Sequence, residues 1–190
     1  MKLKEFNNFS LVGGTALALK FGHRISVDLD FFSNKDFDIE NITKALQTEF
    51  TSNFLIESKN LKWGLFCFIE DIKVDIIHYK HPTIYQPDTI ENIRIYSTPD
   101  IAAMKINAIL GRGKKNYFWD LLELLQHYKL AELISFYNKK YASQNLLITI
   151  PQAITYFDDA EDSEEPVSLK NQTWDSVKKA IQKSVREYLS

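Results

Sequence analysis

The sequence has almost no cysteine, no long apolar run and little excess charge, and each absence excludes a class of protein. A single cysteine, Cys67, rules out a disulfide framework, and its apolar neighbours predict a buried structural thiol. No apolar stretch approaches the ~20 residues that cross a bilayer, and the N-terminal MKLKEFNNFS lacks the apolar centre of a signal peptide. The formal net charge is −2, so a nucleic-acid partner would need a local basic patch. We therefore expect a globular, cytoplasmic protein.

The first half alternates strand-like and helix-like segments, whereas the second half is helical. Alternating, β-branched and aromatic residues predict strands at 26–32, 54–58, 63–70, 73–79 and 93–97. Apolar spacing of three and four residues predicts helices at 15–21, 41–50, 119–128 and 131–141, a helix opened by Pro99, and a last helix from Thr173. The ambiguous stretch 146–157 is taken as helix and the acidic run 158–165 as a surface loop. The fold class is therefore α+β, divided near Thr98 into a core, 1–98, and a helical lobe, 99–190.

Two acids in Val27-Asp28-Leu29-Asp30-Phe31 are the first candidate for chemistry. Side chains two apart on a strand point to one face, so both carboxylates would lie together while their apolar neighbours face the core. Their repulsion costs roughly 3–4 kcal/mol at an effective dielectric near 20. A divalent cation or a raised pKa must offset it, and hard oxygen ligands suit Mg²⁺. Taken alone, the pair could also be surface or turn acids.

The pair Gly13-Gly14 precedes the first predicted helix and is the second candidate. Glycine lets a phosphate approach the backbone, and a helix N-terminus offers unpaired N–H groups to it. The Thr15 hydroxyl would add a donor. Arg24 would either bind a phosphate through both arms of its guanidinium or pair with Asp28 or Asp30 in the empty site. A phosphate-binding turn beside a metal-binding strand suits a nucleoside triphosphate.

The order and spacing of these two motifs resemble the signature of the DNA polymerase β-like nucleotidyltransferase superfamily. More narrowly, GGTALALKFGHRISVDLDFF is similar to the AbiEii-type toxin family of abortive-infection and toxin–antitoxin systems. The resemblance continues through 100–108, through RGKKNYFWDLLELL, and through YFDDAE and 174–179 near the end. It therefore covers nearly the whole chain, and 11–32 is its most specific part. It implies a mixed β-sheet flanked by helices and followed by a C-terminal helical lobe.

The resemblance also implies a Mg²⁺ site of three acids, with Asp75 as the third beside Asp28 and Asp30. Two metal ions so held would clamp the α-phosphate and activate the attacking hydroxyl. An acid among apolar neighbours needs a cationic partner, which favours this role for Asp75. The alternative is a surface acid on an edge strand.

Further along the chain, the resemblance implies that Lys105 contacts the triphosphate and that Asp120 helps organise the site. From the residues alone, Lys105 lies opposite the helix strip formed by Ile101, Met104 and Ile109, so a solvated lysine is an equal alternative. One departure stands out. The family often has an acid three residues before the position of Asp120, where this chain has Tyr117, preceded by Asn116.

The implied function is transfer of a nucleoside monophosphate from a nucleoside triphosphate to an acceptor hydroxyl, with RNA such as a tRNA 3′ end as acceptor. A toxin of this kind implies a cognate antitoxin protein as partner. Two groups of basic residues could contact RNA phosphates, and the alternative is that they are solvated surface side chains. The first group is Arg112, Lys114 and Lys115, and the second, on the last predicted helix, is Lys178, Lys179, Lys183 and Arg186. Two alternatives remain: a catalytically weakened nucleotide-binding module that acts through a protein partner, and a nucleotidyltransferase that modifies a protein hydroxyl.

Overall fold

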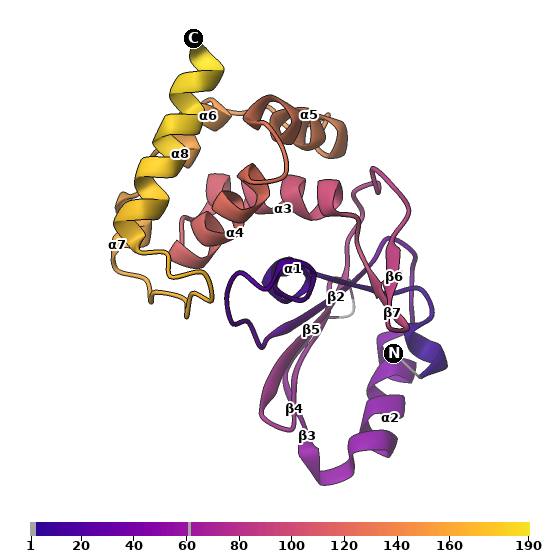
Figure 1. The fold of residues 1–190 in the computed structure, drawn as a ribbon. Coiled ribbons are helices and arrows are strands. Elements are labelled where there is room, and N and C mark those ends of the chain that lie inside the picture. The colour runs from indigo at the N-terminus through magenta and orange to yellow at the C-terminus, as the bar shows by residue number, and fades with distance from the viewer. Residues whose placement is uncertain (1–2, 61) are drawn as a thin grey trace.

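The computed structural model describes residues 3–60 and 62–190. In this part of the chain the strands form one mixed seven-stranded sheet in the order β3-β4-β5-β2-β1-β7-β6 (Figure 1). The strands are β1 (Ser10–Val12), β2 (Leu29–Ser33), β3 (Phe54–Asn60), β4 (Gly64–Ile69), β5 (Ile72–His78), β6 (Asp88–Ile90) and β7 (Ile93–Ile95). The helices are α1 (Gly13–Phe21), α2 (Ile39–Phe50), α3 (Thr98–Gly111), α4 (Lys115–Leu125), α5 (Leu130–Lys140), α6 (Ile150–Ile154), α7 (Asp158–Glu161) and α8 (Trp174–Leu189). The α+β class with a helical second half is confirmed.

The two faces of the sheet bury different helices. On one face α2 packs over the apolar side chains of β4 and β5, and this core contains the buried Cys67. Burial raises the pKa of the Cys67 thiol to about 12, as expected of a structural cysteine. On the other face α1 lies over β1 and β2, and the helical half stands above it (Figure 1).

Local sequence signals explain where several elements begin and turn. The Asp38 side chain accepts backbone N–H bonds at the start of α2, and Ser97 does the same for α3, where Pro99 occupies the first turn. Between β4 and β5, Glu70 and Asp71 have φ angles of 50° and 66°, as a tight two-residue hairpin requires. The predicted hairpin is therefore confirmed.

Other predicted elements need correction. The strand predicted at 26–32 begins only at Leu29. Strands β1 and β6 are not predicted from the sequence, because each is only three residues long and too short to show a period. The helix predicted for 146–157 is confirmed only as α6, and the acidic run contains the short helix α7 rather than a loop throughout.

The change of architecture falls where α3 begins, at Thr98. One hydrophobic core nevertheless runs across this point, because it joins Leu11 and Val12 of the sheet to Ile101 and Leu121 of the helices. The division into domains 1–98 and 99–190 stays a prediction. Within the described residues, the helices lack the combination of length and apolarity that crossing a bilayer requires.

Candidate active site

Asp30 and Asp75 face each other on neighbouring strands in the middle of the sheet. In the parallel pairing of β2 with β5 they are direct partners. Because β5 lies between β4 and β2, the edge-strand alternative for Asp75 is wrong. Asp28 lies just ahead of β2, rather than inside a strand as predicted, and its side chain is exposed where Asp30 and Asp75 are half-buried. The pair therefore opens to solvent at Asp28.

The electrostatics of this pair are those of crowded acids. Burial raises the pKa of Asp30 to about 6, Lys105 opposes the shift, and the charges of Asp75 and Asp28 add to it. The pKa of Asp75 is raised as well, first by burial, with Lys73 opposing. The Asp75 Oδ1 atom is buried without a hydrogen-bond partner. A buried, unpartnered carboxylate oxygen is costly unless a cation or a proton joins it.

These residues fit a magnesium ion that also takes oxygens from its substrate. Among residues 3–60 and 62–190, no three Asp, Glu, His or Cys side chains converge into a ready-made metal cage. Mg²⁺ is usually held by one or two carboxylates with phosphate oxygens and water as the other ligands, so a full protein cage is not required. The paired Asp30 and Asp75, with the orphaned Asp75 Oδ1, supply this kind of donor set.

The glycine pair Gly13-Gly14 lies directly against Asp30 and Arg24. Gly13 opens α1 with a φ of 76°, and a Cβ atom there would overlap the Asp30 carboxylate. A Cβ at Gly14 would overlap the Arg24 guanidinium. Helix α1 begins without a side-chain cap, which leaves its first N–H groups available to an anion. The Thr15 hydroxyl is less available, because it is buried, donates to the Asp28 carbonyl oxygen, and lies 2.9 Å from the Ser26 hydroxyl.

Asp120 is fully buried at the centre of a cluster of basic side chains, His23, Arg24 and Lys105. Arg24 donates to both of its carboxylate oxygens at 2.7 and 3.0 Å, and Lys105 Nζ lies 2.7 Å from Oδ2. His23 Nε2 lies 2.7 Å from Oδ1. Burial alone would raise the pKa of Asp120, but Lys105, His23 and Arg24 outweigh it and hold that pKa far below its usual range. Arg24 thus pairs with Asp120, and its predicted pairing with Asp28 or Asp30 is wrong.

Lys105 is buried rather than solvated, so that alternative is also wrong. Ile101 and Lys105 are four residues apart and therefore share one helix face, and α3 is enclosed on most sides. The Lys105 ammonium lies 5.2 Å from the centre of the Tyr117 ring. Its positive charge also lowers the pKa of Asp30 and so partly offsets the effect of burial. Tyr117, where the resemblance implied an acid, is therefore part of the site.

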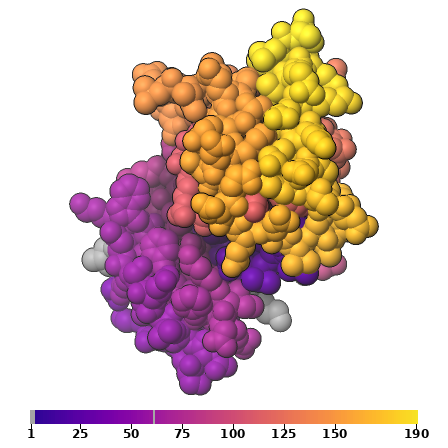
Figure 2. Space-filling model, turned by 90° about the vertical axis from the view of Figure 1, so that its left-hand side faces the viewer, coloured from indigo at the N-terminus to yellow at the C-terminus, as the bar shows by residue number. Residues whose placement is uncertain are grey.

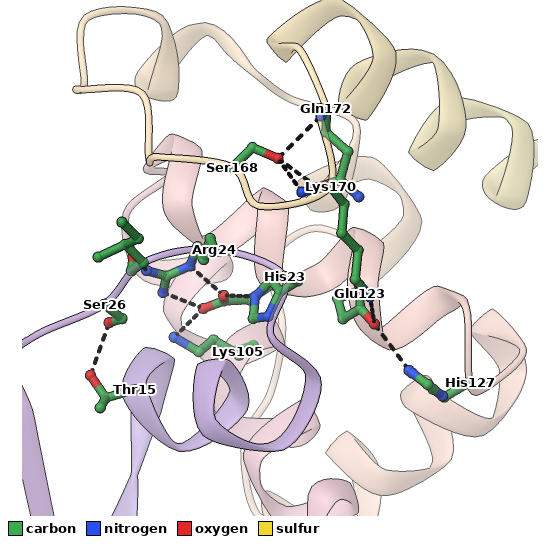
Figure 3. Close-up of polar contacts among 12 residues, drawn as sticks. Thr15, His23, Arg24, Ser26, Lys105, Glu123, His127, Ser168, Lys170 and Gln172 are labelled. Atoms are coloured by element: carbon green, nitrogen blue, oxygen red, sulfur yellow. Dashed lines mark hydrogen bonds and ion pairs between the residues drawn. The ribbon is translucent and has the colours of Figure 1, made fainter.

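A strap formed by residues 167–170 holds the loop that precedes Asp28. Ile25 N donates to Val167 O, and Leu169 N donates to His23 O, both at 2.9 Å. Lys170 Nζ then reaches both oxygens of the buried Glu123 at 2.8 Å (Figure 3). The strap, His23 and Glu123 are not among the residues that the sequence predicts for this region. No local pattern marks them, since His23 and Asp120 are 97 positions apart.

The candidate RNA-binding residues divide into two groups. Arg112 and Lys114 line a cavity of about 410 Å³ that also borders Arg24 and the 163–166 segment. On α8, Lys178 pairs with Glu161 at 2.9 Å and Lys183 with Glu187 at 3.7 Å, so these lysines have acidic partners. The first group therefore lies beside Arg24, and the second lies on α8.

Comparison with known proteins agrees with this architecture. Residues 2–59 match the sequence model of a family described as "Nucleotidyl transferase AbiEii toxin, Type IV TA system". An uncharacterized protein of Aquifex aeolicus, aq_aa25, is 33% identical over 189 residues, which cover 96% of this chain and 89% of the relative.

Two solved structures share the fold at low sequence identity. MenT4, a nucleotidyltransferase toxin from Mycobacterium tuberculosis, superposes with a TM-score of 0.63 at 14% identity, over 95% of this chain and 76% of that one. JHP933 from Helicobacter pylori superposes with a TM-score of 0.53 at 18% identity, over 95% and 84% of the two chains. The two solved structures thus show the shared fold, while the matched family model and the 33% identical relative show that the chain belongs to the AbiEii nucleotidyltransferase family.

Proposed function

We propose that this nucleotidyltransferase moves a nucleoside monophosphate from a nucleoside triphosphate to a hydroxyl of RNA, such as the 3′ end of a tRNA. The observation that carries the proposal is the pairing of Asp30 with Asp75 directly beside the Gly13 turn. Carboxylates for a metal and backbone N–H groups for a phosphate thus lie in contact, which is what a metal-bound triphosphate needs at its two kinds of charge.

Asp30 and Asp75, with Asp28 at the exposed side, would hold Mg²⁺. When bound, the ion supplies charge stabilisation at the α-phosphate and activates the attacking hydroxyl. Asp30 and Asp75 then remain deprotonated, because the cation offsets the repulsion and burial that otherwise raise their pKa values.

The remaining proposed roles follow from the contacts of each side chain. The N–H groups at Gly14 and Thr15 would donate to a phosphate at the start of α1, and Lys105 adds a positive charge that acts on Asp30. The Arg24 guanidinium packs against Gly14 and so holds the turn in place. Asp120 in turn holds Arg24 and Lys105 through its two carboxylate oxygens. Arg24, Lys105 and Asp120 would therefore position the triphosphate as one connected unit.

RNA as acceptor is supported by Arg112 and Lys114, which border the site beside Arg24. The family description, a toxin of a two-component system, supports a toxic activity and an antitoxin protein as partner. A weakened nucleotide-binding module has one observation in its favour: Tyr117, beside Lys105, stands in the position where the resemblance implies an acid.

The test is an acceptor assay with the full chain, Mg²⁺ and each nucleoside triphosphate labelled at the α-phosphate. Total RNA and total protein are offered together, and the label is followed on gels after nuclease or protease treatment. Label on RNA that nuclease removes is the expected result. Label on protein would replace RNA with a protein hydroxyl as acceptor, and triphosphate binding without any transfer would favour the binding module.

A further inference from the structure

One face of the strands β3, β4 and β5 is not covered by a core. Leu65 and Cys67 of β4 and Val74 of β5 point towards α2. Because side chains alternate along a strand, the neighbouring residues of each strand point to the opposite face. Phe66 and Phe68 are half-buried on that other face and belong to neither hydrophobic core of the described residues. Figure 2 looks towards this side of the molecule, where the purple strand region lies beneath the orange and yellow helical half.

The register places this face next to the acids of the site. Phe66 is the direct partner of Asp75, and Phe68 lies between Leu55 on β3 and Lys73 on β5. We call Leu55, Phe66, Phe68 and Lys73 the β4 face. Its two aromatic rings are two residues apart on one strand, which separates them by roughly 7 Å. The β4 face is therefore continuous with Asp75 and, through it, with Asp30.

The β4 face is aromatic, and the cation Lys73 beside it neighbours the acid Asp75, on whose charge Glu57 of β3 also acts. Leu55 is an apolar side chain that is nevertheless 66% exposed, so this part of the sheet face is open to solvent. Lys73 is 42% exposed, and its Nζ lies 3.7 Å from Asp75 Oδ2. Some RNA-binding sheets hold single strands by stacking unpaired bases on aromatic side chains of the sheet face, while nearby cations contact the backbone phosphates.

We infer that the β4 face binds the terminal bases of a single-stranded RNA acceptor, with bases stacked on Phe66 and Phe68 and a backbone phosphate at Lys73. The acceptor hydroxyl then lies beside Asp75 and Asp30, where Arg112 and Lys114 can contact phosphates further along the strand. This inference rests on the proposed function only for the statement that the bound end is the one that reacts.

The test measures affinity rather than activity. A 5′-fluorescein-labelled single-stranded RNA of 12 nucleotides is titrated with the full chain at low salt, and fluorescence anisotropy reports Kd. We expect the double substitution F66L/F68L to raise Kd at least tenfold, because leucine keeps the apolar volume but cannot stack. The matched control is Phe54→Leu, since Phe54 lies on β3 of the same sheet but packs with the α2 core. Its Kd should stay within about twofold of wild type.

A second RNA separates stacking from charge. In this probe the last three positions carry no base, and wild type should bind it as weakly as F66L/F68L binds the intact RNA. The inference is overturned if F66L/F68L keeps wild-type affinity, if Phe54→Leu loses as much affinity, or if the abasic RNA binds as tightly as the intact one.

The outcome is distinguishable from that of the proposed function. Nucleotide transfer to RNA by wild type, with RNA affinity unchanged in F66L/F68L, would overturn this inference alone. Selective loss of RNA affinity in that variant, for a chain that transfers no nucleotide to RNA, would support the inference and overturn the proposed function.

Discussion

At the scale of single residues, Asp120 is the carboxylate at the centre of a buried cluster of charge. Its two oxygens contact His23, Arg24 and Lys105, and all four side chains are buried. We predict that Asp120→Asn lowers the free energy of unfolding by about 3–5 kcal/mol, because the buried cations lose their counter-charge. Urea unfolding measures this loss.

The matched control for that substitution is Asp175→Asn. Asp175 is 78% exposed and pairs with Lys178 at 3.6 Å on the surface of α8. An exposed pair of this kind contributes about 0–1 kcal/mol. Equal losses of unfolding free energy in the two variants would show that the buried contacts of Asp120 stabilise the fold no more than an exposed ion pair does.

The same carboxylate gives a pH prediction with a definite sign. The pKa of Asp120 is lowered in the folded state, so its stabilising contribution is fully present above the ordinary carboxyl pKa of about 3.9 and is lost as pH falls below it. The difference in unfolding free energy between wild type and Asp120→Asn should therefore shrink below about pH 4. Denaturant unfolding from pH 7 to pH 3 measures it, and a difference that stayed constant would refute the assignment.

Gly13 makes a prediction about geometry. Its φ of 76° disfavours any side chain, and a Cβ would also overlap the Asp30 carboxylate. Gly22 has a φ of 58° with nothing within 4 Å of an added Cβ, so Gly22→Ala carries the backbone strain alone, about 1–2 kcal/mol. We predict that Gly13→Ala additionally lowers the transfer rate about 100-fold, because it displaces Asp30. Similar rates in the two variants would contradict a close fit between turn and acid.

At the scale of elements, the strap of residues 167–170 joins the C-terminal half to the loop before Asp28. Lys170 anchors it by binding the buried Glu123, whose pKa is lowered because Lys170 and His127 outweigh the effect of burial. We predict that Lys170→Met costs about 2–3 kcal/mol of stability, since Glu123 would keep only its 3.1 Å contact with His127. The variant should also show faster amide hydrogen exchange at 23–25, and unchanged exchange there would contradict a role for the strap.

The sequence predicts elements and sites to the extent that their causes are local. The Gly13-Gly14 turn, the start of α3 at Pro99 and the Glu70-Asp71 hairpin are set by neighbouring residues, and the sequence predicts them. Helix α2 was expected from Asn41 and begins two residues earlier, at Ile39. The short strands β1 and β6 form because other strands pair with them, so their own three residues hold too little pattern. Likewise 146–149, whose Leu147 is fully exposed, stays outside a helix, although the ambiguous stretch 146–157 was taken as helix.

Long-range partners set a second limit on what could be predicted. Asp30 and Asp75 were chosen from spacing and resemblance, and their adjacency depends on the parallel pairing of β2 with β5. A solvated Lys105 was an equal alternative, because its acid partner, Asp120, lies on another helix, α4, and the sequence of α3 alone does not reveal this pairing. The position of Tyr117 beside Lys105 follows from the same packing of α3 against α4 and could not be read from either helix alone.

At the scale of the whole molecule, binding of magnesium and triphosphate should stabilise the folded chain. A ligand that binds only the native state adds about 2.7 kcal/mol at 100 times its Kd. We predict this gain for wild type in the presence of both Mg²⁺ and a nucleoside triphosphate, and its loss in Asp30→Asn and Asp75→Asn. Both variants should fold normally without ligand, because each relieves crowding between acids. Thermal unfolding with and without EDTA measures the effect, and an EDTA-resistant gain would exclude the proposed metal site.

The central claim is that Asp30 and Asp75 are the acids at which nucleotide transfer occurs. It is tested most directly by the rate at which α-phosphate label moves from a nucleoside triphosphate to RNA in wild type, Asp30→Asn and the control Asp36→Asn. Asp36 follows the same strand as Asp30, but its side chain is 98% exposed. We predict a rate at least 100-fold lower for Asp30→Asn and unchanged for Asp36→Asn. Transfer by Asp30→Asn at the wild-type rate would contradict the claim.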